Sequence, residues 1–232
     1  LHAYAFVEDK NHRSMKLCNR FDFKKAQEIQ TLLFHRFNPS SHSQIRLLTH
    51  EELQGMDHKL RHFYDSYKAY HTEGIIQQGY FLGYWMNGEW VAITRIMRHL
   101  WNIERLPERF SFLHKWKLDR WPYLRRVIPG QAFHFLTADY FWFKQGYERY
   151  LEKIMEHALA KEDVNTVMLW LSKESPHNQV LRKSISWGFF NKLEHSSSIS
   201  LVMREFGGDR VEAQEIKILK TKICPTFISA HD

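Results

Sequence analysis

The chain has 232 residues, of which 44% are hydrophobic and 15% are aromatic, and it carries a formal net charge of +7. This composition is typical of a globular protein with a substantial core and excludes a disordered chain, while the length allows one domain or two small ones. Since no run of about 18 apolar residues occurs, we expect no membrane-spanning helix. The excess of positive charge suits an anionic ligand or a nucleic acid.

Cysteine and histidine form no complete ligand pattern. Cys18 and Cys224 lie far apart in the sequence, which favours a reduced, cytoplasmic setting without a thiolate metal site. His58 and His62 have the spacing of two ligands on one helix face, but no third ligand accompanies them. No signal peptide is visible. We therefore expect a cytoplasmic protein that holds no metal.

Residues 1–44 are the least regular part of the chain. Residues 3–7 and 14–21 are predicted to pair as a hairpin, and residues 23–37 are predicted to form a helix. A turn follows at Asn38, because the residue before a proline avoids the helical region. These residues are too few for a comfortable independent domain, so we expect them to pack on the domain that follows.

The main domain is expected to span residues 45–206, with a tail at residues 207–232. It is predicted to start with a strand at residues 44–48. Thr49 then has the capping-box spacing with a glutamate three residues later, which predicts a helix running to about Tyr70.

Two strands, at residues 79–86 and 89–97, are predicted to flank Asn87-Gly88, which is the strongest short-range signal of a β-hairpin. After them, residues 98–130 are rich in tryptophan and in basic side chains and have no clean periodicity. We interpret this segment as an insertion.

Residues 131–190 predict a βαβα unit. An apolar strand leads through a glycine-containing loop to a helix at residues 150–160 with one apolar stripe, and a second apolar strand follows at residues 166–171. A last helix starts at Ser175 and is predicted to stop at Gly188. Such a strand–helix–strand connection is right-handed and places its two strands parallel.

From residue 44 onward the expected order is therefore β, α, β, β, insertion, β, α, β, α, and a final strand at residues 197–205. This order, the Gly146 loop before a helix, and the pattern Asn178…Gly188-Phe189 resemble the GNAT superfamily of acyl-CoA-dependent N-acyltransferases. The resemblance implies an α/β fold whose mixed, largely antiparallel central sheet is flanked by helices and contains a splayed central strand pair. It also implies acyl transfer from acetyl-CoA or another acyl-CoA to an amine acceptor.

The resemblance further implies where acyl-CoA binds. Members of the family bind the pyrophosphate on backbone N–H groups at a helix start, where the helix dipole favours an anion. The matching loop residues are Lys144, Gln145, Gly146 and Tyr147. The strand residues that would offer their backbone to the pantetheine arm are Leu136, Thr137 and Ala138, and Asn178 matches an asparagine that reaches the same arm. Gly146 also suits an ordinary turn, and Asn178 also suits a local helix cap.

The loop departs from the family pattern at two positions. Phe143 stands where the family has arginine or glutamine. Glu148 stands where the family has a second small residue, and a carboxylate beside a pyrophosphate is unfavourable.

Acyl transfer to an amine needs a base for the amine proton and an acid for the leaving thiolate. The position of the family's tyrosine acid matches Ser184, whose hydroxyl is a poor acid. Asp139 and His134, on the expected central strand, are the candidate bases. Each of them also suits a structural role, and positioning with water as proton carrier is a further route.

Two other functions stay open. A strand ending in Arg95 is similar to a strand of the acyl-homoserine-lactone synthases, which share this architecture. The second is a non-catalytic GNAT-like binding module, for example one for RNA. It would use the aromatic and basic residues of segment 98–130 to stack on bases and neutralise phosphates. An ordered insertion that packs its tryptophans on the core explains the same residues. The sequence specifies neither the acceptor nor the oligomeric state.

Overall fold

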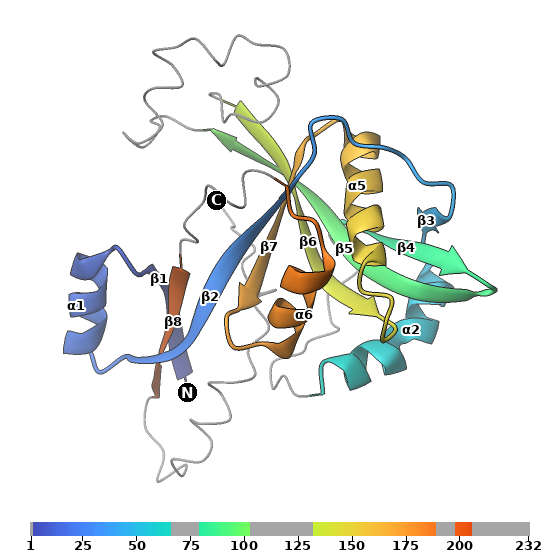
Figure 1. The fold of residues 1–232 in the computed structure, drawn as a ribbon. Coiled ribbons are helices and arrows are strands. Elements are labelled where there is room, and N and C mark those ends of the chain that lie inside the picture. Colours follow the sequence, from blue (N-terminus) through green and yellow to red (C-terminus); the bar gives the residue numbers. More distant parts are fainter. Residues whose placement is uncertain (1, 66–78, 103–131, 189–197, 206–232) are drawn as a thin grey trace.

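The computed structural model describes residues 2–65, 79–102, 132–188 and 198–205 (Figure 1). These residues form an eight-stranded sheet with the strand order β1-β8-β2-β7-β6-β5-β4-β3. All neighbouring strands are antiparallel except β6 and β7, which are parallel. In chain order the elements are β1 (His2–Glu8), α1 (His12–Arg20), β2 (Lys24–His35), β3 (Ile45–Leu47), α2 (His50–Phe63), β4 (Tyr80–Met86), β5 (Glu89–Asn102), β6 (Ala132–Phe143), α5 (Tyr150–Glu162), β7 (Thr166–Ser172), α6 (Pro176–Ser184) and β8 (Ser198–Glu205).

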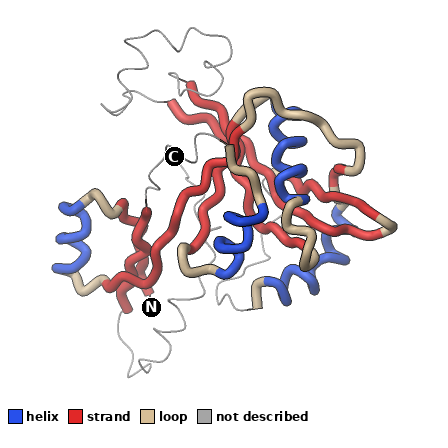
Figure 2. Tube along the Cα trace, viewed as in Figure 1, coloured by secondary structure: helices blue, strands red, loops and turns tan. Residues whose placement is uncertain are grey.

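Helices cover both faces of the sheet. In the view of Figures 1 and 2, α5 and α6 stand in front of the strands and α2 lies behind them. Successive strand residues point to opposite faces, and the core divides accordingly. Leu82 and Ala92 belong to the cluster that contains the α5 residues, whereas Phe81 and Ile93 belong to the cluster that contains the α2 residues. The predicted mixed, largely antiparallel α/β fold is confirmed.

Local signals in the sequence account for α2 and α5. The predicted capping box is present at α2: the Glu52 N–H donates to Thr49 Oγ1 at 3.2 Å, and the Thr49 N–H donates to Glu52 Oε2 at 2.9 Å. This helix ends at Phe63, earlier than the predicted Tyr70. In α5 the predicted apolar stripe is buried against the sheet. Its residues are Leu151, Ile154, Met155, Ala158 and Leu159.

The predicted hairpin is also present. Asn87 and Gly88 both have positive φ, 51° and 81°, as the tight turn between right-twisted strands requires. Strand β5 runs on to Asn102, so the first residues of the predicted insertion 98–130 extend the sheet. The rest of that segment and the tail at 207–232 lie outside the described residues.

The strand–helix–strand unit has the predicted topology, with β6 and β7 parallel and joined through α5. Pro176 is the first residue of α6, after Ser175. The helix ends at Ser184, so the prediction that it runs to Gly188 was wrong.

The predictions for residues 14–21 and 23–37 were wrong. The first of these segments lies mostly in α1, whose start is capped because the Ser14 N–H donates to Asn11 Oδ1 at 3.1 Å. The second forms β2, which pairs with β7 on one side and β8 on the other. Its apolar residues fit a helical period as well as a strand, and pairing with two distant strands decided between them. Residues 2–35 thus supply two strands of the sheet itself.

Substitution of two glycines by alanine is predicted to have opposite effects on the free energy of unfolding. A Cβ on Gly83 in β4 would lie 2.5 Å from the Trp90 ring and 2.7 Å from Leu48, whereas a Cβ on Gly55 in α2 would meet nothing within 4 Å. We expect Gly83→Ala to lower the free energy of unfolding by about 1–3 kcal/mol through overpacking. Gly55→Ala should raise it by about 0.5–1 kcal/mol through helix propensity. Urea unfolding followed by tryptophan fluorescence measures both, and a stabilised Gly83→Ala variant would contradict the packing described.

Candidate functional site

The central feature of the site is the short contact between β6 and β7. The two strands pair at only two positions, Leu136 with Val167 and Thr137 with Met168. Beyond these positions the strands diverge, and Figure 1 shows the opening gap with α6 in front of it. The splayed central strand pair expected from the sequence is therefore present, and the facing backbone groups of the diverging segments do not pair across the gap.

A β-bulge sits where β6 leaves β7. Asp139 pairs with Arg95 and the next recorded pair is Trp142 with Ile93, so β6 contains one residue more than β5 over this stretch. Tyr140 has φ of 43°, a conformation that is uncommon for a residue with a side chain. Bulges bend a strand and increase its twist. The bulge thus accompanies the turn of β6 away from β7.

Side chains bind two carbonyl groups of β6 at this bulge. The Thr94 hydroxyl donates to the Asp139 carbonyl oxygen at 2.8 Å, and the Tyr64 hydroxyl donates to the Phe141 carbonyl oxygen at 2.7 Å. Both acceptors are therefore occupied, so a ligand in the gap would have to use other backbone groups of β6.

The three β6 residues predicted to contact a pantetheine arm lie at the start of the gap. Leu136 and Thr137 form the two strand pairs with β7, and Ala138 is the first residue beyond them. The Thr137 side chain is 2.9 Å from His99 Nε2. Of the three, only Ala138 lies beyond the last pair between β6 and β7.

The loop between β6 and α5 contains the predicted pyrophosphate site. Gly146 has φ of 84°, and a Cβ there would meet nothing within 4 Å, so the glycine serves the backbone conformation rather than a tight contact. The Tyr147 N–H donates to the Lys144 carbonyl at 2.9 Å. Arg149, at the N-cap of α5, makes no side-chain cap. The first two N–H groups of the helix are used locally instead, since Tyr150 donates to the Tyr147 carbonyl at 3.0 Å and Leu151 donates to the Glu148 carbonyl at 3.1 Å.

The loop already binds an anion, and the anion is its own carboxylate. The Gly146 N–H donates to Glu148 Oε1 at 2.9 Å. This carboxylate therefore stands in for the ligand oxygen that a backbone donor of this loop would bind. The geometry fits an anion, but the negative charge of Glu148 must leave before a pyrophosphate can take its place.

Basic side chains surround the same loop. Lys144 Nζ is 2.6 Å from Glu89 Oε1 in an exposed ion pair, and the Arg149 guanidinium lies 5.3 Å from the centre of the Tyr150 ring. Exposed pairs of this kind are weak, so either cation can turn toward an anionic ligand. The backbone of Gln145 lies in the same turn.

Asn178 lies in the first turn of α6 and is buried. Its Nδ2 donates to the Ser172 carbonyl at 3.0 Å, and its Oδ1 accepts from Arg182 Nε at 2.9 Å. The side chain thus ties α6 to the end of β7, which is the local role left open by the sequence. Beside it, the buried Ser172 hydroxyl finds no partner among the described residues, so a polar group remains available at the open end of the gap.

An aromatic cluster lies at that open end. The Phe63 and His177 rings stack with centroids 4.1 Å apart and an interplanar angle of 3°, and Phe141 and Phe143 meet the His177 ring edge-on. Phe63 packs against the core on both faces of the sheet, which a side chain can do only where the sheet is open. The stacked pair therefore closes part of the gap. Burial in this cluster lowers the pKa of His177 to about 4.

The structure separates the three candidate catalytic residues. Asp139 lies two positions beyond the last β6–β7 pair, whereas His134 pairs with Leu100 at the other end of β6 and Ser184 is the last residue of α6. Both Asp139 oxygens accept from Arg95, Nε to Oδ1 and Nη2 to Oδ2, each at 2.7 Å. Burial raises the pKa of the Asp139 carboxyl, and the Arg95 guanidinium opposes that rise.

The sequence analysis missed several residues of this site, among them Phe63, Tyr64 and His177. Phe63 ends α2, Tyr64 is its C-cap and His177 lies in α6, so they are far apart in the chain and no motif connects them. The positive φ of Tyr140 likewise had no sequence signal, since glycine or asparagine usually marks such a position.

Among the comparisons with known proteins, the one with solved structures identifies the fold. No family model matches the chain, and no curated protein sequence matches it either. A GCN5-related N-acetyltransferase from Sphaerobacter thermophilus superposes with a TM-score of 0.50 at 8% identity, covering 88% of this chain and 59% of that chain.

Two further solved structures are similar at lower TM-scores. A GNAT-family acetyltransferase from Colwellia psychrerythraea gives 0.42 at 13% identity over 86% of this chain and 64% of its own. N-myristoyltransferase from Saccharomyces cerevisiae, with bound myristoyl-CoA, gives 0.44 at 8% identity over 78% of this chain and 50% of its own. The chain thus spans between half and about two thirds of the length of these proteins. It has the fold of the GNAT acyltransferases.

Among the helices that the structure describes, none has the length and apolar character needed to cross a membrane.

The buried His177 makes stability depend on pH. Because its pKa is lowered to about 4, the folded protein keeps this ring neutral while the unfolded chain protonates it near pH 6.5. Stability should therefore fall as the pH drops from about 6.5 to 4, with a contribution of about 1–2 kcal/mol from this ring. His177→Phe keeps the stack on Phe63 and should remove that contribution.

Urea midpoints between pH 7.5 and 4.5 measure the effect. The pKa of His35 is also lowered to about 4 by burial, so the variant should retain part of the pH dependence. An identical slope in both proteins would show that His177 is not held neutral by this cluster.

Proposed function

We propose that the chain is a GNAT-type N-acyltransferase, with an acyl-CoA as donor and an amine as acceptor. The observation that carries this proposal is the gap between β6 and β7, which opens toward the loop before α5. Strand backbone that is unpaired across the gap thus lies next to a glycine loop at a helix start, where the Gly146 N–H is bound by the exchangeable Glu148 carboxylate. An extended pantetheine arm needs the first of these features, and a pyrophosphate needs the second.

The reaction proposed is a single transfer. The amine nitrogen attacks the thioester carbonyl carbon, a C–N bond forms, and the C–S bond breaks. The amine proton goes to a base, and the departing thiolate takes up a proton. The protein would orient the two reactants and supply the first proton acceptor.

The residues proposed to hold acyl-CoA follow from the geometry above. Ala138, the first β6 residue beyond the strand pairs, and the Ser172 hydroxyl, which has no partner among the described residues, would contact the pantetheine arm. The loop from Lys144 to Tyr147 would bind the pyrophosphate once the Glu148 carboxylate has rotated away. We propose acetyl-CoA as the donor, because the Phe63–His177 stack closes part of the open end.

Asp139 is the proposed proton acceptor among the three candidates. It lies where the strands have parted, and burial raises its pKa, which brings a carboxylate closer to the range of a useful base. Arg95 binds both of its oxygens and would orient the carboxylate. His134 lies at the other end of β6, and Ser184, at the end of α6, has a hydroxyl that is a poor base.

Removal of the competing carboxylate should strengthen donor binding. Glu148→Ala frees the Gly146 N–H and removes a negative charge next to the expected pyrophosphate. We expect its affinity for acetyl-CoA to rise about threefold to tenfold over the unchanged protein, as charge effects at a helix start allow. Calorimetric titration with acetyl-CoA and with longer acyl-CoAs measures this.

Asp57→Asn is the matched control. It changes the net charge by the same amount on α2, where Asp57 is in an exposed pair with Arg61, and it should leave the affinity unchanged. Weaker binding by Glu148→Ala would refute the proposed loop site. The absence of heat with any acyl-CoA in both proteins would leave a non-catalytic binding module as the better function.

The proposed role of Asp139 as a proton acceptor can be separated from its contribution to folding stability. Asp139→Asn leaves Arg95 buried without its ionic partner and should lower the free energy of unfolding by about 3–5 kcal/mol. The double variant Arg95→Leu with Asp139→Leu removes both charges and should regain most of that stability. If Asp139 is the base, the double variant should still lose about 10²–10⁴ in turnover.

The assay is thiol release from acetyl-CoA in the presence of a polyamine, an amino sugar or a lysine-containing peptide. A stable double variant with unchanged turnover would restrict Asp139 to a structural role.

A further inference from the structure

The chain contains the same strand–loop–helix unit twice. Strands β1 and β7 each have seven residues, and helices α1 and α6 each have nine. Three residues connect strand to helix in both cases, so a constant offset of 164 relates His2 to Thr166 and His12 to Pro176. Each unit is followed by one more strand, β2 after α1 and β8 after α6.

The two units are related by a pseudo-two-fold axis. Strand β1 is antiparallel to β8, β7 is antiparallel to β2, and β2 and β8 are antiparallel to each other. Exchanging β1 with β7 and β2 with β8 leaves this set of pairs unchanged. Ile29 pairs with Ile199 at the centre of the arrangement. The strand that follows each unit thus pairs with the strand of the other unit: β2 pairs with β7, and β8 pairs with β1.

Hydrogen bonds repeat across this axis. The Asp9 N–H donates to the Ser198 carbonyl at 3.1 Å, and the equivalent Lys173 N–H donates to the Glu28 carbonyl at 2.9 Å. In the same way, the bond from the Asn11 N–H to the Glu8 carbonyl at 2.8 Å is matched by the bond from the Ser175 N–H to the Ser172 carbonyl at 3.1 Å. The equivalence therefore extends to individual backbone groups.

The outer sides of the two units differ. Strand β7 has β6 as its outer neighbour, whereas β1 is the edge strand of the described sheet. Equivalent apolar residues differ in the same sense: Leu181 is 0% exposed and Leu17 is 56% exposed, while Ile185 is 5% exposed and Phe21 is 50% exposed.

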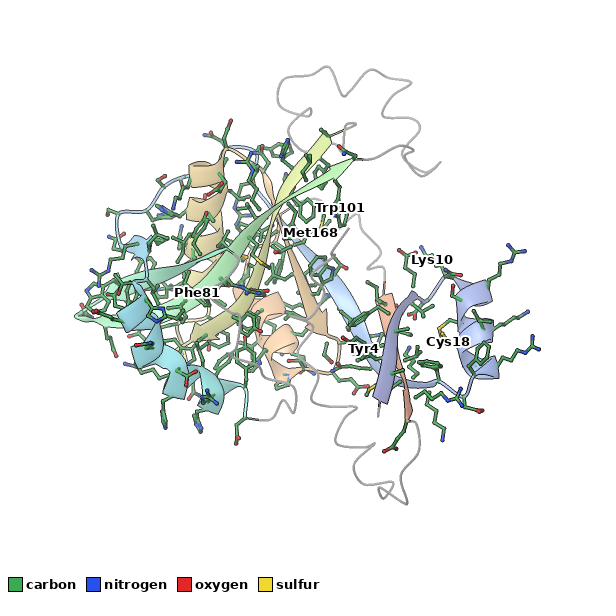
Figure 3. All side chains as sticks on the ribbon, turned by 180° about the vertical axis from the view of Figure 1, so that it is seen from behind. Tyr4, Lys10, Cys18, Phe81, Trp101 and Met168 are labelled. Atoms are coloured by element: carbon green, nitrogen blue, oxygen red, sulfur yellow. The ribbon has the colours of Figure 1, made fainter. Side chains whose placement is uncertain are left out.

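The strands show the same contrast. Met168 in β7 is 8% exposed, but Tyr4 in β1 is 57% exposed. In Figure 3, Met168 lies within the body of the sheet and Tyr4 lies at its N-terminal edge.

Leu181 and Ile185 are buried in a core cluster whose members include Ile154 and Leu159 of α5 and Phe141 of β6. Among the described residues, the first unit has no β6–α5 pair beside it, and its equivalent apolar side chains, Leu17 and Phe21, are exposed. An edge strand with exposed apolar residues is also a site where another strand can add.

We propose that the outer edge of β1 and the apolar side of α1 bind a second strand–helix segment of the β6–α5 type. Its strand would pair parallel with β1, as β6 does with β7, and its helix would cover Leu17 and Phe21. The occupant is a GNAT-like half that lacks its own strand–loop–helix unit. A second copy of this chain does not meet that description, because its β6 is already paired with its own β7.

An extended chain tests the proposal. A copy of residues 45–165 is placed directly before residue 2, so that the connection between the copied α5 and β1 equals the native connection between α5 and β7. Half of the β1 amides point away from β8. We expect hydrogen exchange at these outward amides to slow by about 100-fold or more relative to the original chain.

Variants on the two helices provide the control. Leu17→Glu with Phe21→Glu changes residues that are exposed in the original chain, so that chain should fold unchanged. In the extended chain the double variant should abolish the new protection. Val180→Glu, at a residue 36% exposed on α6, should leave the protection intact.

Three outcomes would overturn the proposal. One is unchanged exchange of β1 in the extended chain, and another is insolubility of the extended chain where the original is soluble. The third is that the outward β1 amides are already protected in the original chain. Protection that is lost on dilution would mean that a second copy covers the edge, and protection that persists would mean that another part of the same chain covers it. None of these results depends on acyl-CoA binding.

Discussion

The parting of β6 and β7 after Thr137 is the constraint on which the rest of the site depends. Two parallel strands that separate leave backbone groups without strand partners, and such groups need other acceptors and donors when they are buried. Thr94 and Tyr64 supply them for two β6 carbonyls, and the bulge at Tyr140 sets the direction in which β6 leaves. In the function proposed above, the remaining groups along the gap would bind the pantetheine arm.

In the proposed acyl-CoA site, one of the side chains of the loop before α5 would compete with the ligand. The glycine conformation of this loop and the helix start favour negative charge, and the nearest negative charge is Glu148, two residues from the N–H that it binds. A ligand with two phosphate groups has more charge and more oxygens than one carboxylate, so it can compete. The outcome is a balance of affinities, set by a single side chain in an otherwise suitable loop.

Local features of the site and fold were predictable from the sequence because local interactions determine them. The Thr49 capping box, the Asn87-Gly88 turn and the apolar stripe of α5 each depend on residues within one or two turns of each other. Local interactions could not show that β2 is a strand rather than a helix, because the strands that pair with it, β7 and β8, lie far away in the sequence. The Phe63–His177 stack was equally hidden, because it joins α2 to α6 through a gap that exists only in the folded sheet.

The insertion of β2 between β7 and β8 has a consequence for biosynthesis. Ile29 pairs with Ser172 on one side and with Ile199 on the other, so this strand leaves the ribosome long before either neighbour is made. Until then its apolar residues have no sheet to join, which slows productive folding and invites pairing with other nascent chains. A chaperone that holds β2 extended until β7 has been made would therefore favour correct pairing.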